Sequence, residues 1–337
     1  MKLFQSVKHA VGRLAYSLMS HAPANWNQKF SILMDVLATD PRRMRKLPPM
    51  ALVFLSMPDL DSAFPGLDAD SLSTLRRFVA SQYFIGDAPH LYSAIPPYAF
   101  LWNGLCTQEE FDQALADDKR MEELKVRYHL RYGKPSSLIH HHGLRLLPPK
   151  VLANLQDTVF VDAGAYEGDS TLVFLQYHPQ VVWAFEPSPP NQEIFRHTMQ
   201  ANGIPEKSIH LIPKGLSDKP SIIRFSAKAS GDCTLTDKGR CKAELVPLDS
   251  LKPPARIGLI KADLEGMGMF MLRGAVQTIQ RDKPVLTLNF YHNMDEFLNT
   301  YAFVRGLGVP YEYKVLSFFP PWKNCEVALL AWPRDLD

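Results

Sequence analysis

The chain has 337 residues, of which 46% are hydrophobic and 21% are charged, a balance typical of a folded protein with a substantial core. Its formal net charge of +2 is too small to indicate a nucleic-acid-binding protein, and no apolar stretch reaches the length that spans a bilayer. The four cysteines form no Cys-x-x-Cys pair, which argues against a zinc site or a disulfide framework and favours a reducing cytoplasm.

The first segment carries apolar residues at helical spacing, from Leu3 to Leu18, with basic residues among them. It lacks the uninterrupted apolar run of a secretory signal. We expect this stripe to pack on the protein itself, with peripheral contact to a membrane surface as the alternative.

Residues 1–135 predict a mostly helical region broken by proline-rich turns. One helix is expected over 68–84, and the capping box Thr107–Glu110 opens another that runs toward Arg131. No catalytic constellation is evident there. RYGKPSS, at residues 131–137, is the expected linker to a second domain at 136–337.

Beyond the linker, strand and helix patterns alternate, which predicts parallel β-α-β units in a doubly wound α/β sheet. Seven main strands are expected at Thr158–Ala163, Val181–Phe185, Ile209–Pro213, Ile257–Ala262, Pro284–Phe290, Tyr311–Ser317 and Glu326–Trp332. Helices are expected at Ser170–His178, Pro190–Asn202, Met267–Gln280 and Asp295–Leu307, and hairpins within 221–248. The ligand of such a sheet binds at the carboxyl ends of its strands.

The first strand ends in VFVDAGAYEGDS, at residues 159–170. A dinucleotide-binding turn would carry a glycine where Asp162 stands. An acid at this place repels a pyrophosphate and attracts a ligand with a sulfonium and an amino group. Gly164 allows close backbone approach, and Gly168 is expected to sit against the strand. A tight turn with solvated acids is the alternative.

Two later strand ends add weaker signals. Glu186 follows the second main strand, where a carboxylate can accept both hydroxyls of a ribose. Ser217 and Asp218 follow the third, where an adenine edge would be contacted, although a simple turn explains them equally well.

Ionisable residues alternate at the end of the fourth main strand, in IKADLEG. Lys261, Asp263 and Glu265 therefore share one face beside the reacting end of the ligand. The alternative is that Lys261 simply pairs with one of the acids.

In combination, these motifs resemble those of FkbM-type methyltransferases, an S-adenosylmethionine-dependent family with a seven-stranded Rossmann-like sheet. The likeness covers about residues 140–333 and is carried by VDAGAYEGDST, AFEPSPPN, VPLDSL, IKADLEG with LRGA, KPVLTLNFYHNMDEF and EVALLAWP. The resemblance implies S-adenosyl-L-methionine as cofactor. Its implied binding set is Asp162, Gly164, Ala165, Glu167, Gly168, Asp169, Ser170, Glu186, Pro187, Ser217, Asp218 and Asp263.

One position departs from the family pattern, lysine-x-aspartate-x-glutamate-glycine-x-glutamate. Gly268 replaces the final acid. If that acid positions the acceptor, this protein takes a different acceptor or has lost activity.

Methyl transfer requires the nucleophile, the methyl carbon and the sulfur in line, and a hydroxyl nucleophile also benefits from a base. His292 is the first candidate for that base and Asp263 the second, with Glu265 and Lys261 beside the transferring methyl. Three histidines, His140–His142, precede the first strand. Adjacent histidines seldom converge on one metal ion, so no metal is expected. By analogy with related proteins, one histidine should contact ligand and the others face solvent.

The sequence thus favours an O-methyltransferase acting on a hydroxyl of a sugar, a glycan or a related metabolite; the sugar rests on the family resemblance. Tyr98, Phe100 and Trp102 could stack on such a sugar, although a core role is the simpler interpretation. The alternatives are a catalytically silent binding or scaffold protein and, less favoured, a nicotinamide-dependent dehydrogenase.

Overall fold

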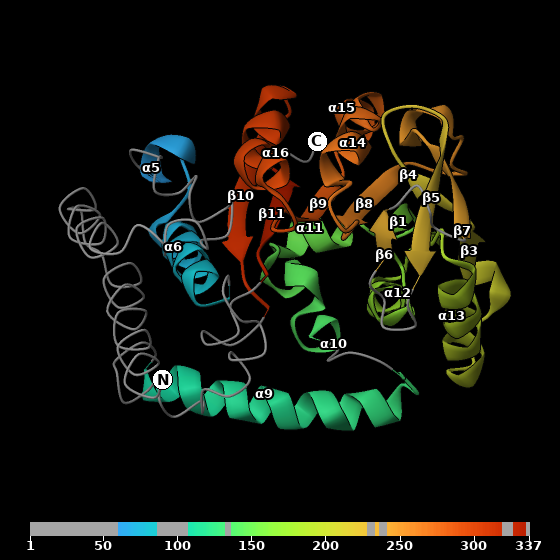
Figure 1. Ribbon diagram of the computed structural model, residues 1–337, viewed down its shortest axis with the longest axis horizontal. Coiled ribbons are helices and arrows are strands. Elements are labelled where there is room, and N and C mark those ends of the chain that lie inside the picture. The colour runs from blue at the N-terminus through green and yellow to red at the C-terminus, as the bar shows by residue number, and fades with distance from the viewer. Residues whose placement is uncertain are drawn as a thin grey trace, which may run out of the picture. The chain divides into compact units, whose positions relative to one another are not determined.

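Residues 60–85, 107–131, 136–227, 233–235, 241–318 and 326–334 are described by the computed structural model (Figure 1). The chain divides into two compact units, Met1–Ala116 with Lys314–Val327 and Asp117–Tyr313 with Ala328–Asp337. The stripe from Leu3 to Leu18, the aromatic residues at 98–102 and linker residues 132–135 lie outside the described residues. The domain boundary expected near residue 135 therefore stays a prediction.

The first unit contains the helices α5 (Leu60–Ala63) and α6 (Ala69–Ile85). The helix expected over 68–84 is thus confirmed, and its apolar face buries Leu75 and Phe78 completely. Asp68 accepts a hydrogen bond from the Ser71 amide (2.7 Å) at the start of α6, where a carboxylate satisfies a helix amide that has no other partner.

Helix α9 (Gln108–Arg127) begins with the predicted capping box. The Glu110 amide donates to Thr107 Oγ1 (3.1 Å), and the Thr107 amide donates to Glu110 Oε2 (2.9 Å). The two bonds satisfy amides that the helix itself leaves unpaired.

The second unit is built on a mixed seven-stranded sheet in the order β3-β2-β1-β8-β9-β11-β10. β1 pairs in parallel with β2 and β8, and β11 pairs antiparallel with β9. The order confirms the seven-stranded Rossmann-like arrangement. The strands are β1 (Val159–Ala163), β2 (Val181–Phe185), β3 (Ile209–Ile212), β8 (Ile257–Ala262), β9 (Val285–Asn289), β10 (Tyr311–Leu316) and β11 (Ala328–Pro333).

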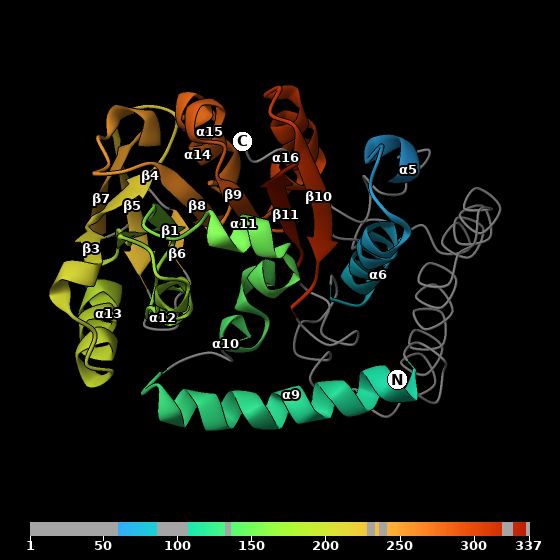
Figure 2. The same cartoon turned by 180° about the vertical axis from the view of Figure 1, so that it is seen from behind.

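The segment in which hairpins were expected forms a separate four-stranded sheet together with β4, in the order β4-β7-β5-β6. Figures 1 and 2 show it beside the end of the large sheet that holds β3. Its strands are β4 (Lys214–Leu216), β5 (Ser221–Ala227), β6 (Cys233–Leu235) and β7 (Cys241–Val246).

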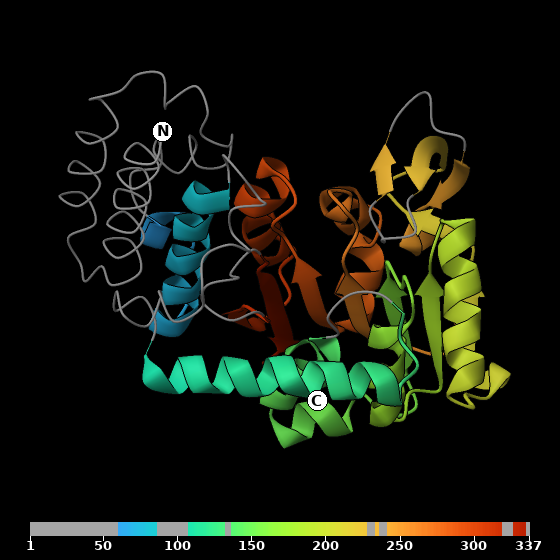
Figure 3. The same ribbon diagram turned by 60° about the horizontal axis from the view of Figure 1, so that its bottom comes forward.

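Helices connect the strands of the large sheet, and Figure 3 shows α13 alongside the green strands. The α-helices are α10 (Ser137–His140), α11 (Pro149–Ala153), α12 (Asp169–Phe174), α13 (Pro189–Ala201), α14 (Gly268–Arg273), α15 (Val276–Asp282) and α16 (Met294–Gly306). The 3-10 segments are His141–Leu146, Leu175–Tyr177, Glu206–Ser208 and Leu248–Ser250.

The core lies on the central strands. Every residue of β1 and of β8 is buried, as expected for parallel strands that are covered on both faces. The chain runs outward from β1 to β3 and then returns to β8 on the other side of β1. The carboxyl ends of β1 and β8 thus form the point at which the strand order reverses, where open α/β sheets bind their ligands.

Candidate functional site

The centre of the site is a buried ion pair between neighbouring strands. Asp162 and Lys261 are register partners on β1 and β8, and Lys261 Nζ lies 3.2 Å from Asp162 Oδ1. Lys261 Nζ also donates to the Gly164 carbonyl (2.7 Å), and Thr171 Oγ1 donates to Asp162 Oδ2 (2.7 Å). Asp162 is fully buried. The alternative expected Lys261 to pair with an acid of its own segment, but its ion pair is with Asp162 on the neighbouring strand.

Burial and charge act in opposite directions on this pair. Burial raises the pKa of Asp162. Burial on its own would lower the pKa of Lys261, but the carboxylates of Asp162 and Asp263 outweigh it, so that this pKa is raised. The lysine therefore stays a cation, and it balances carboxylates on both of its sides.

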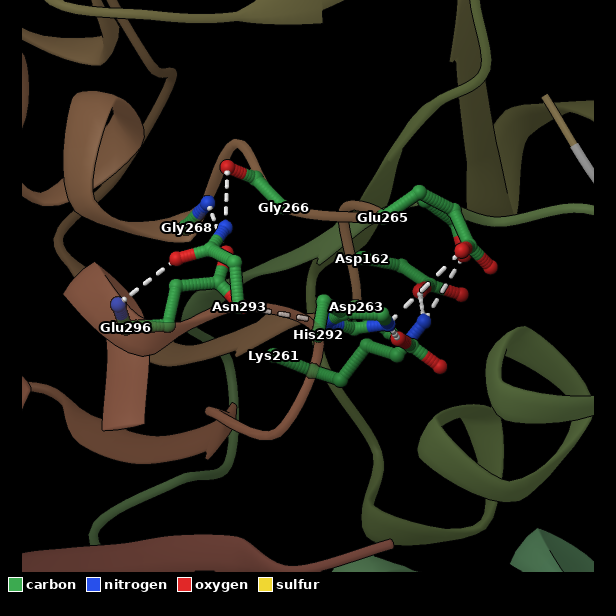
Figure 4. A network of polar contacts seen from close by, with 10 residues as sticks. Asp162, Lys261, Asp263, Glu265, Gly266, Gly268, His292, Asn293 and Glu296 are labelled. Atoms are coloured by element: carbon green, nitrogen blue, oxygen red, sulfur yellow. Dashed lines mark hydrogen bonds and ion pairs between the residues drawn. The ribbon is translucent and has the colours of Figure 1, made fainter. Parts of the chain in front are cut away.

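A second ion pair lies directly beyond the first. His292 Nε2 lies 3.2 Å from Asp263 Oδ1, and Figure 4 shows Lys261 and Asp162 next to this pair. Burial favours a neutral ring, yet Asp263 and Glu296 raise the pKa of His292 to about 10. Burial would also raise the pKa of Asp263, but His292 and Lys261 lower it well below its usual range. At neutral pH the pair is therefore an imidazolium with a carboxylate.

The loop after β8 has an unusual backbone. Glu265 has a φ of 48° and Gly266 a φ of 96°, so two successive residues are left-handed, although only the second is a glycine. The Glu265 side chain is 55% exposed, and its Oε2 lies 3.9 Å from His292 Nε2. Such strain gathers at functional sites, and here it places an accessible carboxylate beside the buried pair.

The glycines of the first turn serve close packing. Gly164 has a φ of 81°, and a Cβ there would lie 2.0 Å from the Asp263 carbonyl oxygen. Gly168 has a φ of 90° and packs against Phe195 and Met199 of α13. The expectation that Gly168 sits against the strand is wrong, because helix side chains fill that space.

Glu186 directly follows β2, and its buried carboxylate is held in place by hydrogen bonds. Its carboxylate accepts hydrogen bonds from the amides of Tyr166 (3.0 Å) and Ser188 (2.8 Å). Burial raises its pKa. Ser188 Oγ and Asn191 Oδ1 are buried beside it and have no hydrogen-bond partner among the described residues. These two residues were not predicted from the sequence. The motif AFEPSPPN could have indicated them, because its polar side chains follow Glu186 at the start of α13.

Three predicted cofactor contacts instead connect the turn to the segment before β1. Glu167 accepts a hydrogen bond from the Arg131 amide (2.9 Å). Asp169 accepts one from the Ser137 hydroxyl, and Ser170 Oγ lies 2.8 Å from His142 Nε2. These contacts fix the shape of the turn, and a direct role in cofactor binding stays a prediction, as it does for Ala165.

The histidine triplet is more buried than expected. His141 is bound on one ring nitrogen by Tyr177 Oη and on the other by Arg145, each at 2.8 Å. Burial, and then the charge of Lys261, lower the pKa of His142 to about 3. The expectation that two of the three face solvent is wrong, because both His141 and His142 are buried. No three His, Cys, Asp or Glu side chains of the described ranges are grouped to hold a metal ion.

Ser217 and Asp218 follow β4 in the smaller sheet. The Ser217 hydroxyl donates to Asp218 Oδ1 (3.2 Å), and the Ser217 carbonyl packs against Gly274. Pro187 lies near this sheet too, 3.9 Å from where a Cβ on Gly215 would be. The adenine-side role of these residues stays a prediction.

Comparison with known proteins identifies the family. Residues 162–313 match the family model of the methyltransferase FkbM domain, a stretch that runs from Asp162 on β1 into β10. The chain carries an FkbM-type methyltransferase domain. This match implies that S-adenosyl-L-methionine is the cofactor, because the family depends on it.

One solved structure agrees with this chain at the level of the fold. The chain resembles methyltransferase FkbM from Methylobacillus flagellatus at 17% identity and a TM-score of 0.52, over 81% of this chain and 57% of that one. It also matches an rRNA methylase from Streptococcus thermophilus at 16% identity and a TM-score of 0.37, over 55% of this chain and 93% of that one. A comparison with curated proteins finds no match. This chain thus spans little more than half the length of its FkbM relative.

The residues present fit the cofactor. Asp162 Oδ1 and Asp263 Oδ1 are buried, and beyond their ion pairs with Lys261 and His292 they make no hydrogen bond among the described residues, so each can still accept from a cationic amino acid group. The unpartnered oxygens of Ser188 and Asn191 lie near the Glu186 carboxylate and suit hydroxyl groups.

In the described part of the chain, no helix is long and apolar enough to cross a membrane.

Proposed function

We propose that this protein is an O-methyltransferase that moves a methyl group from S-adenosyl-L-methionine to a hydroxyl of a sugar, a glycan or a related metabolite. The observation that carries the proposal is the Asp162–Lys261–Asp263–His292 cluster at the reversal point of the sheet. When bound, the cofactor supplies a methyl group on a sulfonium, which is already a good electrophile. The protein has to place the acceptor in line.

The cofactor is held at two separate positions. Asp162 with the Gly164–Gly168 turn would bind the methionine part, and Glu186 with Ser188 and Asn191 would bind the ribose. At the ribose position, support comes from the buried oxygens of Ser188 and Asn191, which have no hydrogen-bond partner among the described residues, and from the two backbone amides that donate to Glu186. At the methionine position it comes from the buried Asp162 carboxylate beside Lys261. A preorganised carboxylate accepts a cis-diol without reorienting.

A carboxylate would accept the proton of the acceptor hydroxyl. Asp263 is ionised and fixed by His292, and Glu265 extends from the strained loop toward solvent. Either can accept the proton as the methyl group transfers. His292 was our first candidate for this base. It can accept a proton only after losing one from a ring whose pKa is raised to about 10, so we propose Asp263 first.

Two ligands test the two positions separately. Asp162→Asn should weaken the binding of S-adenosylmethionine at least tenfold. The affinity for 5′-methylthioadenosine, which lacks the amino acid part, should stay within about twofold of the wild-type value. Glu186→Gln should weaken both ligands alike. Isothermal calorimetry measures this, with circular dichroism to verify folding. Binding of S-adenosylmethionine unchanged by Asp162→Asn would contradict the assignment.

The acceptor class needs a direct assay. Incubation with methyl-labelled S-adenosylmethionine and a panel of saccharides should label a hydroxyl, and Asp263→Asn should reduce the rate at least a hundredfold, within the range that general base catalysis supplies. The sugar itself is suggested by the family resemblance alone.

A silent binding protein is the second candidate, and Gly268 in place of the family's acid favours it. It predicts cofactor binding without turnover on any acceptor in the panel. A nicotinamide-dependent dehydrogenase is less supported, because a buried, ion-paired Asp162 stands where its first glycine would be. Stronger thermal protection by NAD than by S-adenosylmethionine would reverse this order.

A further inference from the structure

A further buried acid lies next to the cluster described so far. Glu296, in the first turn of α16, has 1% of its side chain exposed. Its Oε1 accepts a hydrogen bond from the Gly268 amide (2.7 Å). Its Oε2 lies 3.1 Å from His292 Nδ1. Both oxygens are thus used, each by a group on a different segment.

Position 268 has no side chain, and the Glu296 carboxylate fills that space. A Cβ on Gly268 would lie 2.9 Å from Glu296 Oε1. The backbone of Gly268 is not left-handed, since its φ lies outside the positive range, so conformation does not require glycine there. What glycine provides at this position is room for a carboxylate from another helix.

The Asn293 side chain holds the start of α16 where the Glu296 carboxylate can reach Gly268 and His292. Asn293 caps the helix, because its Oδ1 accepts from the Glu296 amide (2.9 Å). Its Nδ2 donates to the Gly266 carbonyl (3.1 Å) in the strained loop. Figure 4 shows Asn293 and Glu296 on one side of His292 and Asp263 on the other.

His292 therefore connects two carboxylates. Glu296 binds Nδ1, and Asp263 faces Nε2 at 3.2 Å. The other groups near the ring are Glu265 from the loop after β8, at 3.9 Å, and the stacked ring of Tyr291. A histidine that carries protons on both nitrogens has one fixed donor for each acid.

We propose that Glu296 supplies, from α16, the acid that position 268 lacks, and that it acts through His292 as a positioning residue for the Asp263 carboxylate. This inference rests on the proposed function for the role of Asp263. It also answers the question raised by Gly268, because the negative charge is relocated and not lost.

The first test changes the charge and keeps the shape. Glu296→Gln retains an oxygen for the Gly268 amide but removes the negative charge beside His292. The titration midpoint of His292, followed by NMR of the ring protons, should fall by at least about one unit, a tenfold loss of proton affinity. Asp295→Asn is the matched control, since Asp295 is an acid of the same helix turn whose ion pair is with Arg273; it should leave the midpoint unchanged.

The second test moves the acid. Glu296→Ala should lower the midpoint as Glu296→Gln does, and Gly268→Glu combined with Glu296→Ala should restore it to within about half a unit of the wild type. Gly268→Glu alone should destabilise the protein, because both acids then compete for one space. A midpoint that stays at the wild-type value in Glu296→Gln, or a double variant no different from Glu296→Ala, would overturn the inference.

Calorimetry with S-adenosylmethionine separates this inference from the proposed function. Glu296→Gln should bind the cofactor within about twofold of the wild type. Failure of the wild type to bind would refute the proposed function, while the histidine titrations would still decide the role of Glu296.

Discussion

At the scale of single residues, the site depends on how closely two backbone segments approach. Gly164 on the first turn and the carbonyl of Asp263 after β8 leave no space for even a methyl group. The sequence predicted that each residue directly follows a strand. It could not predict that Asp162 faces Lys261, because that contact depends on the register between β1 and β8, which strand patterns do not determine.

Gly164→Ala tests this approach. The new Cβ would meet the Asp263 carbonyl oxygen at 2.0 Å at a left-handed φ of 81°, so the free energy of unfolding should fall by more than about 3 kcal/mol. Gly203→Ala is the control, since Gly203 is also left-handed but has nothing within 4 Å of its added Cβ. It should cost only about 1 to 2 kcal/mol. Urea denaturation measures the free energy of unfolding of both variants. Equal losses would show that the left-handed backbone, and not the close approach to Asp263, determines the cost.

At the scale of elements, the predicted helices and strands are largely confirmed, and their differences have local causes. One helix was expected over Met267–Gln280, but α14 ends at Arg273 and α15 begins at Val276. The break lies at Gly274, whose backbone packs against the Ser217 carbonyl. That contact comes from a distant part of the chain, so apolar spacing along the helix could not indicate it.

Gly274→Ala should therefore destabilise the protein, although alanine is the better helix former. Its Cβ would lie 2.0 Å from the Ser217 carbonyl oxygen, and we expect a loss of about 1 to 3 kcal/mol. Gly306→Ala, at the end of α16 with nothing within 4 Å, should be neutral or stabilising by up to about 1 kcal/mol. Thermal or urea unfolding compares them; stabilisation by Gly274→Ala would contradict the packing argument.

At the scale of the whole molecule, alternation of strands and helices was enough to predict the sheet, and the family resemblance indicated its seven-stranded Rossmann-like arrangement. The charge network across that sheet was less accessible from sequence. His292 follows β9, Asp263 follows β8 and Glu296 begins α16, so three segments have to meet before the histidine acquires its raised pKa.

This network makes stability depend on pH. The pKa of His292 is raised to about 10 in the folded protein from 6.5. Its stabilising effect is therefore complete below about pH 6.5 and is lost as pH rises through about 10. Its size should be of the order of a few kcal/mol. Urea denaturation of the wild type and of His292→Gln isolates it from other titrating groups. The difference between the two proteins should shrink between pH 6.5 and 10, and a constant difference would count against an imidazolium.

The bond between Glu167 and the Arg131 amide has a consequence for how the chain enters this domain. The last described residue before 132–135 is anchored to the loop between β1 and α12. If that loop rearranges, either this hydrogen bond breaks or the chain segment at Arg131 moves with the loop. The segment that enters the domain and the loop after β1 are therefore expected to move together.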